Sequence, residues 1–188
     1  MMTKMFLVAL IFNLTGHYFS PQWNKNKNSS IVKVCNELKN KRCIYNYMTP
    51  EKYVDRISGI IINESKINNI DPLLLTSIIA NESAFYPNAI GKFGEKGLCQ
   101  IMPHGVASET IVFQKNRVIK KRIGDESLFI PEVNLRLCAN SIRSGIESCG
   151  NENWKVAGFH NLGRCPDKEN RYIRNVMNIY KKLKGVIL

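Results

Sequence analysis

Glu82 ends an apolar stretch of the chain, and a glycine-led strip follows it at residues 97–103. Three apolar residues precede Glu82 at helical spacing: Leu75, Ile78 and Ile79. In a helix its carboxylate therefore shares the apolar face. A carboxyl group among apolar side chains keeps its proton to higher pH, because desolvation disfavours the charged form. The pattern is typical of a general acid that protonates a leaving oxygen.

A near copy of this pattern occurs upstream, around Glu64. Residues 60–65 repeat the Ile-Ile-x-Asn-Glu-Ser order of residues 78–83, with apolar residues again three, four and seven positions before the glutamate. A glutamate at such a place is more often a surface charge than a catalyst. Periodicity alone therefore leaves both readings open for both glutamates.

The elements that would position Glu82 are helical. Thr49-Pro50-Glu51 and Asp71-Pro72 are typical helix starts, with a cap residue followed by proline. Further helical patterns begin at Pro131 and stop at Gly150, then cover 154–159 and 172–183. Residues 88–103 carry three glycines and indicate a loop with short extended structure, and no convincing alternating strands appear. We expect a mainly α fold.

Length and composition indicate one folded domain. The chain has 188 residues, of which 44% are hydrophobic, and no apolar run long enough to span a bilayer. Residues 1–16 have a basic start and a short apolar core, which predicts a signal peptide and a periplasmic or secreted protein; an uncleaved anchor or an N-terminal helix is the alternative. We expect a polar linker at 17–49 and the catalytic domain at 50–188.

Six cysteines agree with export, because an even number behind a signal-like segment is typical of disulfides. Short loops favour Cys35 with Cys43 and Cys149 with Cys165, which leaves Cys99 with Cys138; reduced, buried thiols are the alternative. There is no Cys-x-x-Cys pair and only three histidines are present, so we expect no zinc site and no other metal.

The net charge of +12 predicts an anionic partner. No zinc-finger, RNP or bZIP pattern supports nucleic acid, so an anionic wall polymer or a membrane surface is the better fit. The densest basic run, at residues 115–122, is either a solvated face or a rim contact to acidic substrate.

The motifs around Glu82 resemble those of the soluble lytic transglycosylase (SLT) domain. Residues 70–85 contain the Glu-Ser pair, and residues 94–103 match the Gly-Leu-x-Gln-Ile-x-Pro motif of that family. Residues 128–134 and 172–176 add weaker marks, so the resemblance covers about residues 52–183. It implies a lysozyme-like (goose-type/SLT) helical domain with the strip beside the active-site groove. Glu64 has none of these motifs around it.

The resemblance assigns roles to individual residues. Glu82 matches the catalytic acid/base, and Ser83 matches the partner that supports the helix end and the site. The other positions that match substrate-binding or motif residues are Gly97, Leu98, Gln100, Met102, Asn161, Gly163 and Tyr172. Of these Tyr172 is the weakest match, since an aromatic residue at that spacing is more often part of the core.

Two positions depart from the family pattern. His160 stands where the third motif, Ala-Tyr-Asn-x-Gly, usually has tyrosine. A neutral imidazole would donate the same hydrogen bond near the acid, whereas a protonated one would lower the pKa of Glu82. An ordinary half-buried histidine is the structural alternative. Cys99 replaces a residue that is usually Met, Thr or Tyr, and we expect it to tether the strip through a disulfide.

The chemistry implied by the resemblance needs one carboxylate and no cofactor. Glu82 would cleave the bond between N-acetylmuramic acid and N-acetylglucosamine with formation of a 1,6-anhydro ring. Glu95, Asp125 and Glu126 do not occur in a context that fixes a second carboxylate opposite it. The alternatives are a lysozyme-like hydrolase, a glycan-binding module without turnover, and a basic nucleic-acid binder. We expect the chain to bind peptidoglycan strands. We also expect it to work with a secretion or phage machine that spans the cell envelope, and to be a monomer.

Overall fold

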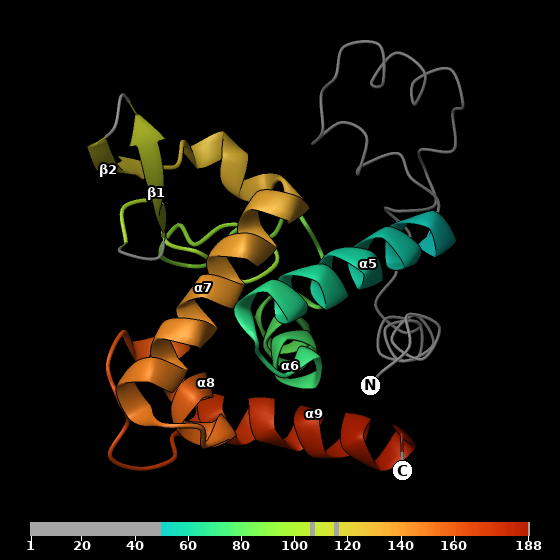
Figure 1. Ribbon diagram of the computed structural model, residues 1–188. Helices are drawn as coiled ribbons and strands as arrows, with labels where there is room; N and C mark the ends of the chain where they lie inside the picture. The colour runs from blue at the N-terminus through green and yellow to red at the C-terminus, as the bar shows by residue number, and fades with distance from the viewer. Residues whose placement is uncertain (1–49, 106–107, 115–116, 188) are drawn as a thin grey trace.

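The computed structural model describes residues 50–105, 108–114 and 117–187, and this part of the chain is mainly helical (Figure 1). The prediction of a mainly α fold is confirmed. The expected signal peptide, the linker and the pairing of Cys35 with Cys43 lie outside the described residues. Within the described residues, no helix combines the length and apolar character needed to cross a bilayer. The elements are α5 (Pro50–Asn68), α6 (Pro72–Ser83), β1 (Glu109–Gln114), β2 (Arg117–Arg122), the 3₁₀ helix η2 (Asp125–Phe129), α7 (Pro131–Cys149), α8 (Asn153–Leu162) and α9 (Arg171–Ile187).

Helix α6 is the central element, because it packs against α5, α7, α8 and α9. Its apolar residues form the middle of the core, and a helix that is apolar on most sides has to be buried in this way. Those that are fully or almost fully buried are Leu74, Leu75, Ile78 and Ile79.

The start of α6 follows the signals in the sequence. The Asp71 side chain accepts a hydrogen bond from the Leu73 amide at 2.8 Å, and Pro72 occupies the first turn. The same carboxylate accepts a hydrogen bond of 2.6 Å from the Tyr180 hydroxyl of α9. Burial, with this contact, raises the pKa of Tyr180 to about 12, so the phenol stays protonated and holds α9 to the N-terminus of α6.

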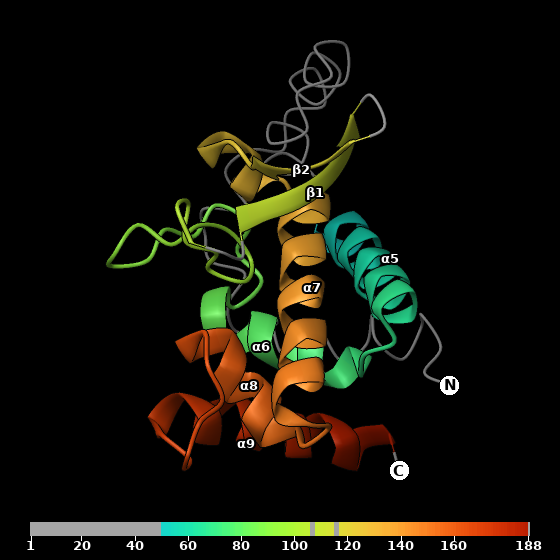
Figure 2. The ribbon, with the colours of Figure 1, turned by 60° about the vertical axis from the view of Figure 1, so that its left-hand side comes forward.

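A two-stranded antiparallel hairpin was missed by the sequence analysis. Strand β1 pairs with β2 from Glu109↔Arg122 to Gln114↔Arg117, and residues 117–122 of the basic run form the second strand. Residues 110–113 and 118–119 are β-branched or aromatic, which favours strands, but lysines and arginines interrupt the alternation and no Asn-Gly turn marks the bend. Figure 2 shows the hairpin near one end of α7, with α8 and α9 at the other end.

Candidate active site

Glu82 lies in the last turn of α6, where several contacts fix the helix end. The backbone turns through left-handed conformations at Ala84 (φ 47°) and Phe85 (φ 63°), which are strained for residues other than glycine. The buried Tyr53 hydroxyl donates to the Phe85 carbonyl at 2.7 Å. The Ser83 hydroxyl donates to the Leu98 carbonyl at 2.8 Å, so the helix end is joined directly to the 97–103 strip.

The strip is held on its other side by Asn134 of α7, which is fully buried. Its side-chain oxygen accepts from the Cys99 amide, and its nitrogen donates to the Lys96 and Leu128 carbonyls, each at 2.8 Å. Gly97 has a φ of +78°, and a Cβ there would come within 2.4 Å of the Asn134 amide nitrogen. Glycine is therefore required at this position. The sequence analysis placed Asn134 only in a weak motif and missed that it holds the strip.

Two disulfides are present in the described part of the chain, and both pairings agree with the sequence analysis, one from the short-loop argument and one by elimination. Cys99 in the strip is bonded to Cys138 of α7, and Cys149 at the end of α7 is bonded to Cys165 beyond α8. The first bond tethers the strip, as expected for Cys99. The second joins the end of α7 to the segment that follows α8.

His160 of α8 lies beside the acid without a hydrogen bond to it. Its side chain is 5% exposed, and Nε2 is 3.9 Å from Glu82 Oε1. On the other side Nδ1 lies 3.2 Å from the Ser141 hydroxyl. Burial lowers the pKa of His160 to about 4, and the opposing effect of a hydrogen bond to the Cys99 backbone is smaller. The imidazole is therefore neutral near pH 7, which removes the protonated alternative that would have lowered the pKa of Glu82.

Tyr172, in the first turn of α9, brings a phenol to the acid. Its hydroxyl lowers the pKa of Glu82 by hydrogen bonding, and burial raises the pKa of Tyr172 itself well above its usual value. No described residue other than Glu82 offers this buried hydroxyl a partner. The phenol therefore lies close enough to the Glu82 carboxyl to influence its pKa.

The Glu82 side chain is 16% exposed, and its pKa is raised from 4.5 to about 7. Burial is the largest cause; the Tyr172 hydroxyl lowers the value, and the negative charge of Glu95 raises it. A carboxyl group with a pKa near neutrality can give up a proton and take one back within one turnover. The geometry therefore suits acid–base chemistry.

Glu95 lies in a loop near the site, close enough for its charge to raise the pKa of Glu82. The sequence did not predict this position. Glu95 accepts a hydrogen bond of 2.9 Å from the Phe93 amide, which fixes the tip of the loop. The Phe93 side chain is 73% exposed. Most of the exposed large apolar residues belong to segments next to Glu82, namely Tyr86, Ile90, Phe93, Met102 and Leu162.

The remaining predicted site residues divide into exposed and buried groups. Met102 and Asn161 are exposed, and Gln100 is partly buried with its amide donating to the Gly97 carbonyl at 2.9 Å. The prediction that Leu98 contacts substrate is wrong for its side chain, which is fully buried in the core. An apolar side chain in the strip packs inward, and the Leu98 carbonyl acts instead by holding Ser83.

Glu64, the near copy, is neither a surface charge nor part of this site. Its side chain is only 4% exposed and lies between α5 and α7, with Oε1 3.6 Å from Arg136 Nε. No contact joins it to the described residues around Glu82.

The family model of the transglycosylase SLT domain matches residues 59–182. The chain belongs to this family. Its enzyme class is therefore that of the peptidoglycan lytic transglycosylases. The chain is also 29% identical over 132 residues to invasion protein IagB from two strains of Salmonella typhimurium, with 66% of this chain and 77% of IagB covered.

A solved structure has a similar fold. It is an inactive mutant of lytic transglycosylase Slt from Pseudomonas aeruginosa, with a TM-score of 0.55 and 16% identity. The match covers 84% of this chain but only 30% of Slt, so the chain spans less than a third of that larger enzyme. At this identity the likeness shows the fold alone, and it is the fold of a lytic transglycosylase domain.

Proposed function

We propose that Glu82 is the single acid/base of this transglycosylase. The protonated carboxyl group donates its proton to the glycosidic oxygen between N-acetylmuramic acid and N-acetylglucosamine, and the bond from that oxygen to C1 breaks. The carboxylate then takes the proton of the muramoyl 6-hydroxyl, whose oxygen bonds to C1. The 1,6-anhydro ring closes, no water is consumed, and Glu82 is protonated again.

The observation that carries the proposal is the burial of the Glu82 side chain, which is 16% exposed and lies 3.9 Å from His160. This burial raises the pKa of Glu82 to about 7, as one group that serves as acid and then as base requires. The neutral His160 contributes by leaving that pKa high. Support also comes from the solved Slt, whose inactive form carries a glutamate-to-glutamine change. We further propose export by residues 1–16, for which their basic start and short apolar core are the support. The relative IagB is named an invasion protein, and this supports a part for the chain in invasion.

A lysozyme-like hydrolase is the second candidate, and the charge of Glu95 favours it. Ordinary glycosidases use two carboxylates, and Glu95 is close enough to raise the pKa of Glu82. In that mechanism Glu95 would activate a water molecule that takes the place of the 6-hydroxyl. The Glu95→Gln variant separates the transglycosylase mechanism from the hydrolase mechanism. Under our proposal the variant still cleaves glycan and forms anhydro products, whereas it loses turnover if Glu95 is a catalytic base.

The test of the proposal is cleavage of purified sacculi by the unmodified chain, by Glu82→Gln and by Glu147→Gln. Glu147 is an exposed carboxylate of α7 that pairs with Arg143 at 2.8 Å, so its variant is a matched control. We expect Glu82→Gln to release no soluble fragments and Glu147→Gln to behave like the unmodified chain. Release by Glu82→Gln at the unmodified rate would refute the assignment.

A further inference from the structure

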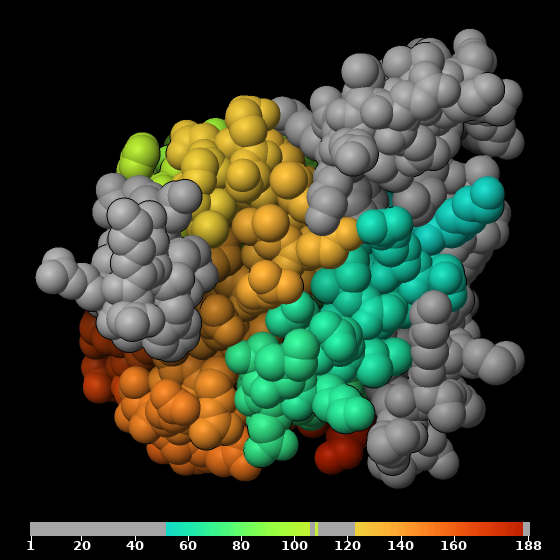
Figure 3. Space-filling view, turned by 45° about the horizontal axis from the view of Figure 1, so that its top comes forward, coloured from blue at the N-terminus to red at the C-terminus, as the bar shows by residue number. Residues whose placement is uncertain are grey.

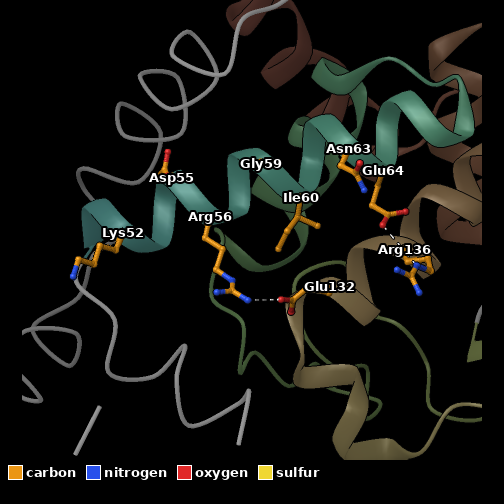
Figure 4. A pocket seen from close by; sticks show the side chains of 9 residues that line it. All are labelled: Lys52, Asp55, Arg56, Gly59, Ile60, Asn63, Glu64, Glu132 and Arg136. Atoms are coloured by element: carbon orange, nitrogen blue, oxygen red, sulfur yellow. Dashed lines mark hydrogen bonds and ion pairs between the residues drawn. The ribbon is translucent and has the colours of Figure 1, made fainter. Parts of the chain in front are cut away.

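A groove of about 580 Å³ lies between α5 and α7, and none of its lining residues belongs to the Glu82 site. Figure 3 shows the two helices side by side on one face of the molecule, and Figure 4 shows the groove itself. Its volume falls within the range of about 300–1,000 Å³ that is usual for ligand pockets. The lining residues are Lys52, Asp55, Arg56, Gly59, Ile60, Asn63, Glu64, Glu132 and Arg136.

Glu64 supplies a buried acceptor to this groove. Its carboxylate is almost wholly out of solvent, and its closest ion-pair contact, to Arg136 Nε, is 3.6 Å long. That distance is too long for a hydrogen bond. Among the described residues, the Glu64 carboxylate accepts no hydrogen bond at all. A buried carboxylate in this condition is costly unless a donor reaches it.

Arg136 supplies the complementary donor. Its side chain is 63% exposed, and its guanidinium makes no hydrogen bond within the described part of the chain. A guanidinium carries five N–H donors in a fixed plane. Figure 4 shows it next to the Glu64 carboxylate. An acceptor and a donor side by side complement a ligand that offers both, such as an ammonium beside a carboxylate or a peptide amide.

The charges along the groove have both signs. Lys52, Arg56 and Arg136 are cationic and Asp55, Glu64 and Glu132 are anionic, with Arg56 and Glu132 joined across the two helices at 2.8 Å. The chain has a net charge of +12, but the positive and negative charges that line this groove are equal in number. Balance disfavours a polyanion and favours a small ligand that carries both charges.

We infer that this groove binds the stem peptide of peptidoglycan, a short peptide with free carboxylates and a free amine. The Glu64 carboxylate accepts from the ammonium of the peptide, and Arg136 donates to a carboxylate. The choice of ligand rests on the proposed function. The chain would then hold its substrate at two places, the glycan at Glu82 and a peptide between α5 and α7.

The test is calorimetric titration of the full chain with a synthetic wall tetrapeptide of L-alanine, γ-linked D-glutamate, meso-diaminopimelate and D-alanine. We expect saturable binding that Arg136→Gln weakens about tenfold, the usual effect of losing a hydrogen bond to a charged group. Arg136→Lys should recover part of the affinity, because lysine keeps the positive charge but lacks the planar guanidinium that donates two parallel N–H groups to a carboxylate. Arg143→Gln, on the same helix but outside the groove, should bind as the unmodified chain does.

Two further arms make the result decisive. Acetylation of both amines of the tetrapeptide, on L-alanine and on diaminopimelate, removes the ammonium and should abolish the contribution of Glu64. Glu64→Gln should therefore weaken the free peptide but not the acetylated one. Absence of tetrapeptide binding, or equal binding by Arg136→Gln, would overturn the inference. Binding does not depend on turnover, so failure of the proposed function is seen separately, as failure to cleave glycan strands from which the peptides have been removed.

Discussion

Glu82→Gln should stabilise the protein at high pH and not at low pH. The pKa of Glu82 is about 7 in the folded chain against 4.5 for an unperturbed carboxyl, and each unit corresponds to about 1.4 kcal/mol. The folded state therefore binds more protons than the unfolded state between these values. The stability that this group contributes is fully present below pH 4.5 and is lost as the pH rises through 7. The loss is about 3 kcal/mol, and glutamine does not incur it.

The assay is urea unfolding with the disulfides intact, for the unmodified chain and the variant at pH 4 and pH 8. We expect the advantage of Glu82→Gln to be about 2–3 kcal/mol larger at pH 8 than at pH 4. Other titrating groups cancel in this double difference, because both chains contain them. Glu147→Gln, which removes an exposed carboxylate, should change the free energy of unfolding by less than about 0.5 kcal/mol.

An advantage of Glu82→Gln that is the same at both pH values would contradict the reasoning. It would mean that Glu82 is solvated as an ordinary surface carboxylate and is not poised near neutrality. The acid–base assignment would then lose its physical basis.

Three more predictions concern the surroundings of the acid. Tyr172→Phe removes the hydroxyl that lowers the pKa of Glu82, so the alkaline limb of the pH–rate profile on sacculi should move to higher pH; a downward shift would contradict the contact. Replacing Cys99 and Cys138 by serine should lower kcat by on the order of tenfold to a hundredfold, with the far-UV circular dichroism retained, because the strip beside the acid is no longer tethered. Unchanged kcat would show that the hydrogen bonds of Asn134 and Ser83 hold the strip without the disulfide. Phe93→Ala should raise KM about fivefold with kcat nearly constant, as measured by release of soluble fragments, and a fall in kcat alone would exclude a binding role.

The helical frame and the position of Glu82 could be predicted because their signals are local. Asp71 and Pro72 start α6 by capping chemistry, and the spacing of Ile78 and Ile79 places Glu82 on the apolar face. The same local pattern could not separate Glu82 from Glu64, since both prove to be largely buried. The difference lies in which helices pack over each glutamate, and periodicity contains no information about that.

Other parts of the site depend on contacts between distant segments. Asn134 holds Cys99 and Lys96, which lie 35 and 38 positions before it in the chain, so the weak motif around Asn134 gave no sign of these contacts. The neutral state of His160 follows from burial by several elements. The hairpin was missed because β2 has four basic residues among its six and reads as a charged run, and because the pairing depends on register between β1 and β2.

The most direct test of the central claim is digestion of peptidoglycan in water enriched in oxygen-18, with the muropeptides weighed. If Glu82 catalyses attack by the muramoyl 6-hydroxyl, the new ends are 1,6-anhydro rings, lighter than hydrolysis products by one water and free of the label. Reducing ends that carry oxygen-18 would contradict the account, because they would show that water, and not the internal hydroxyl, attacks C1.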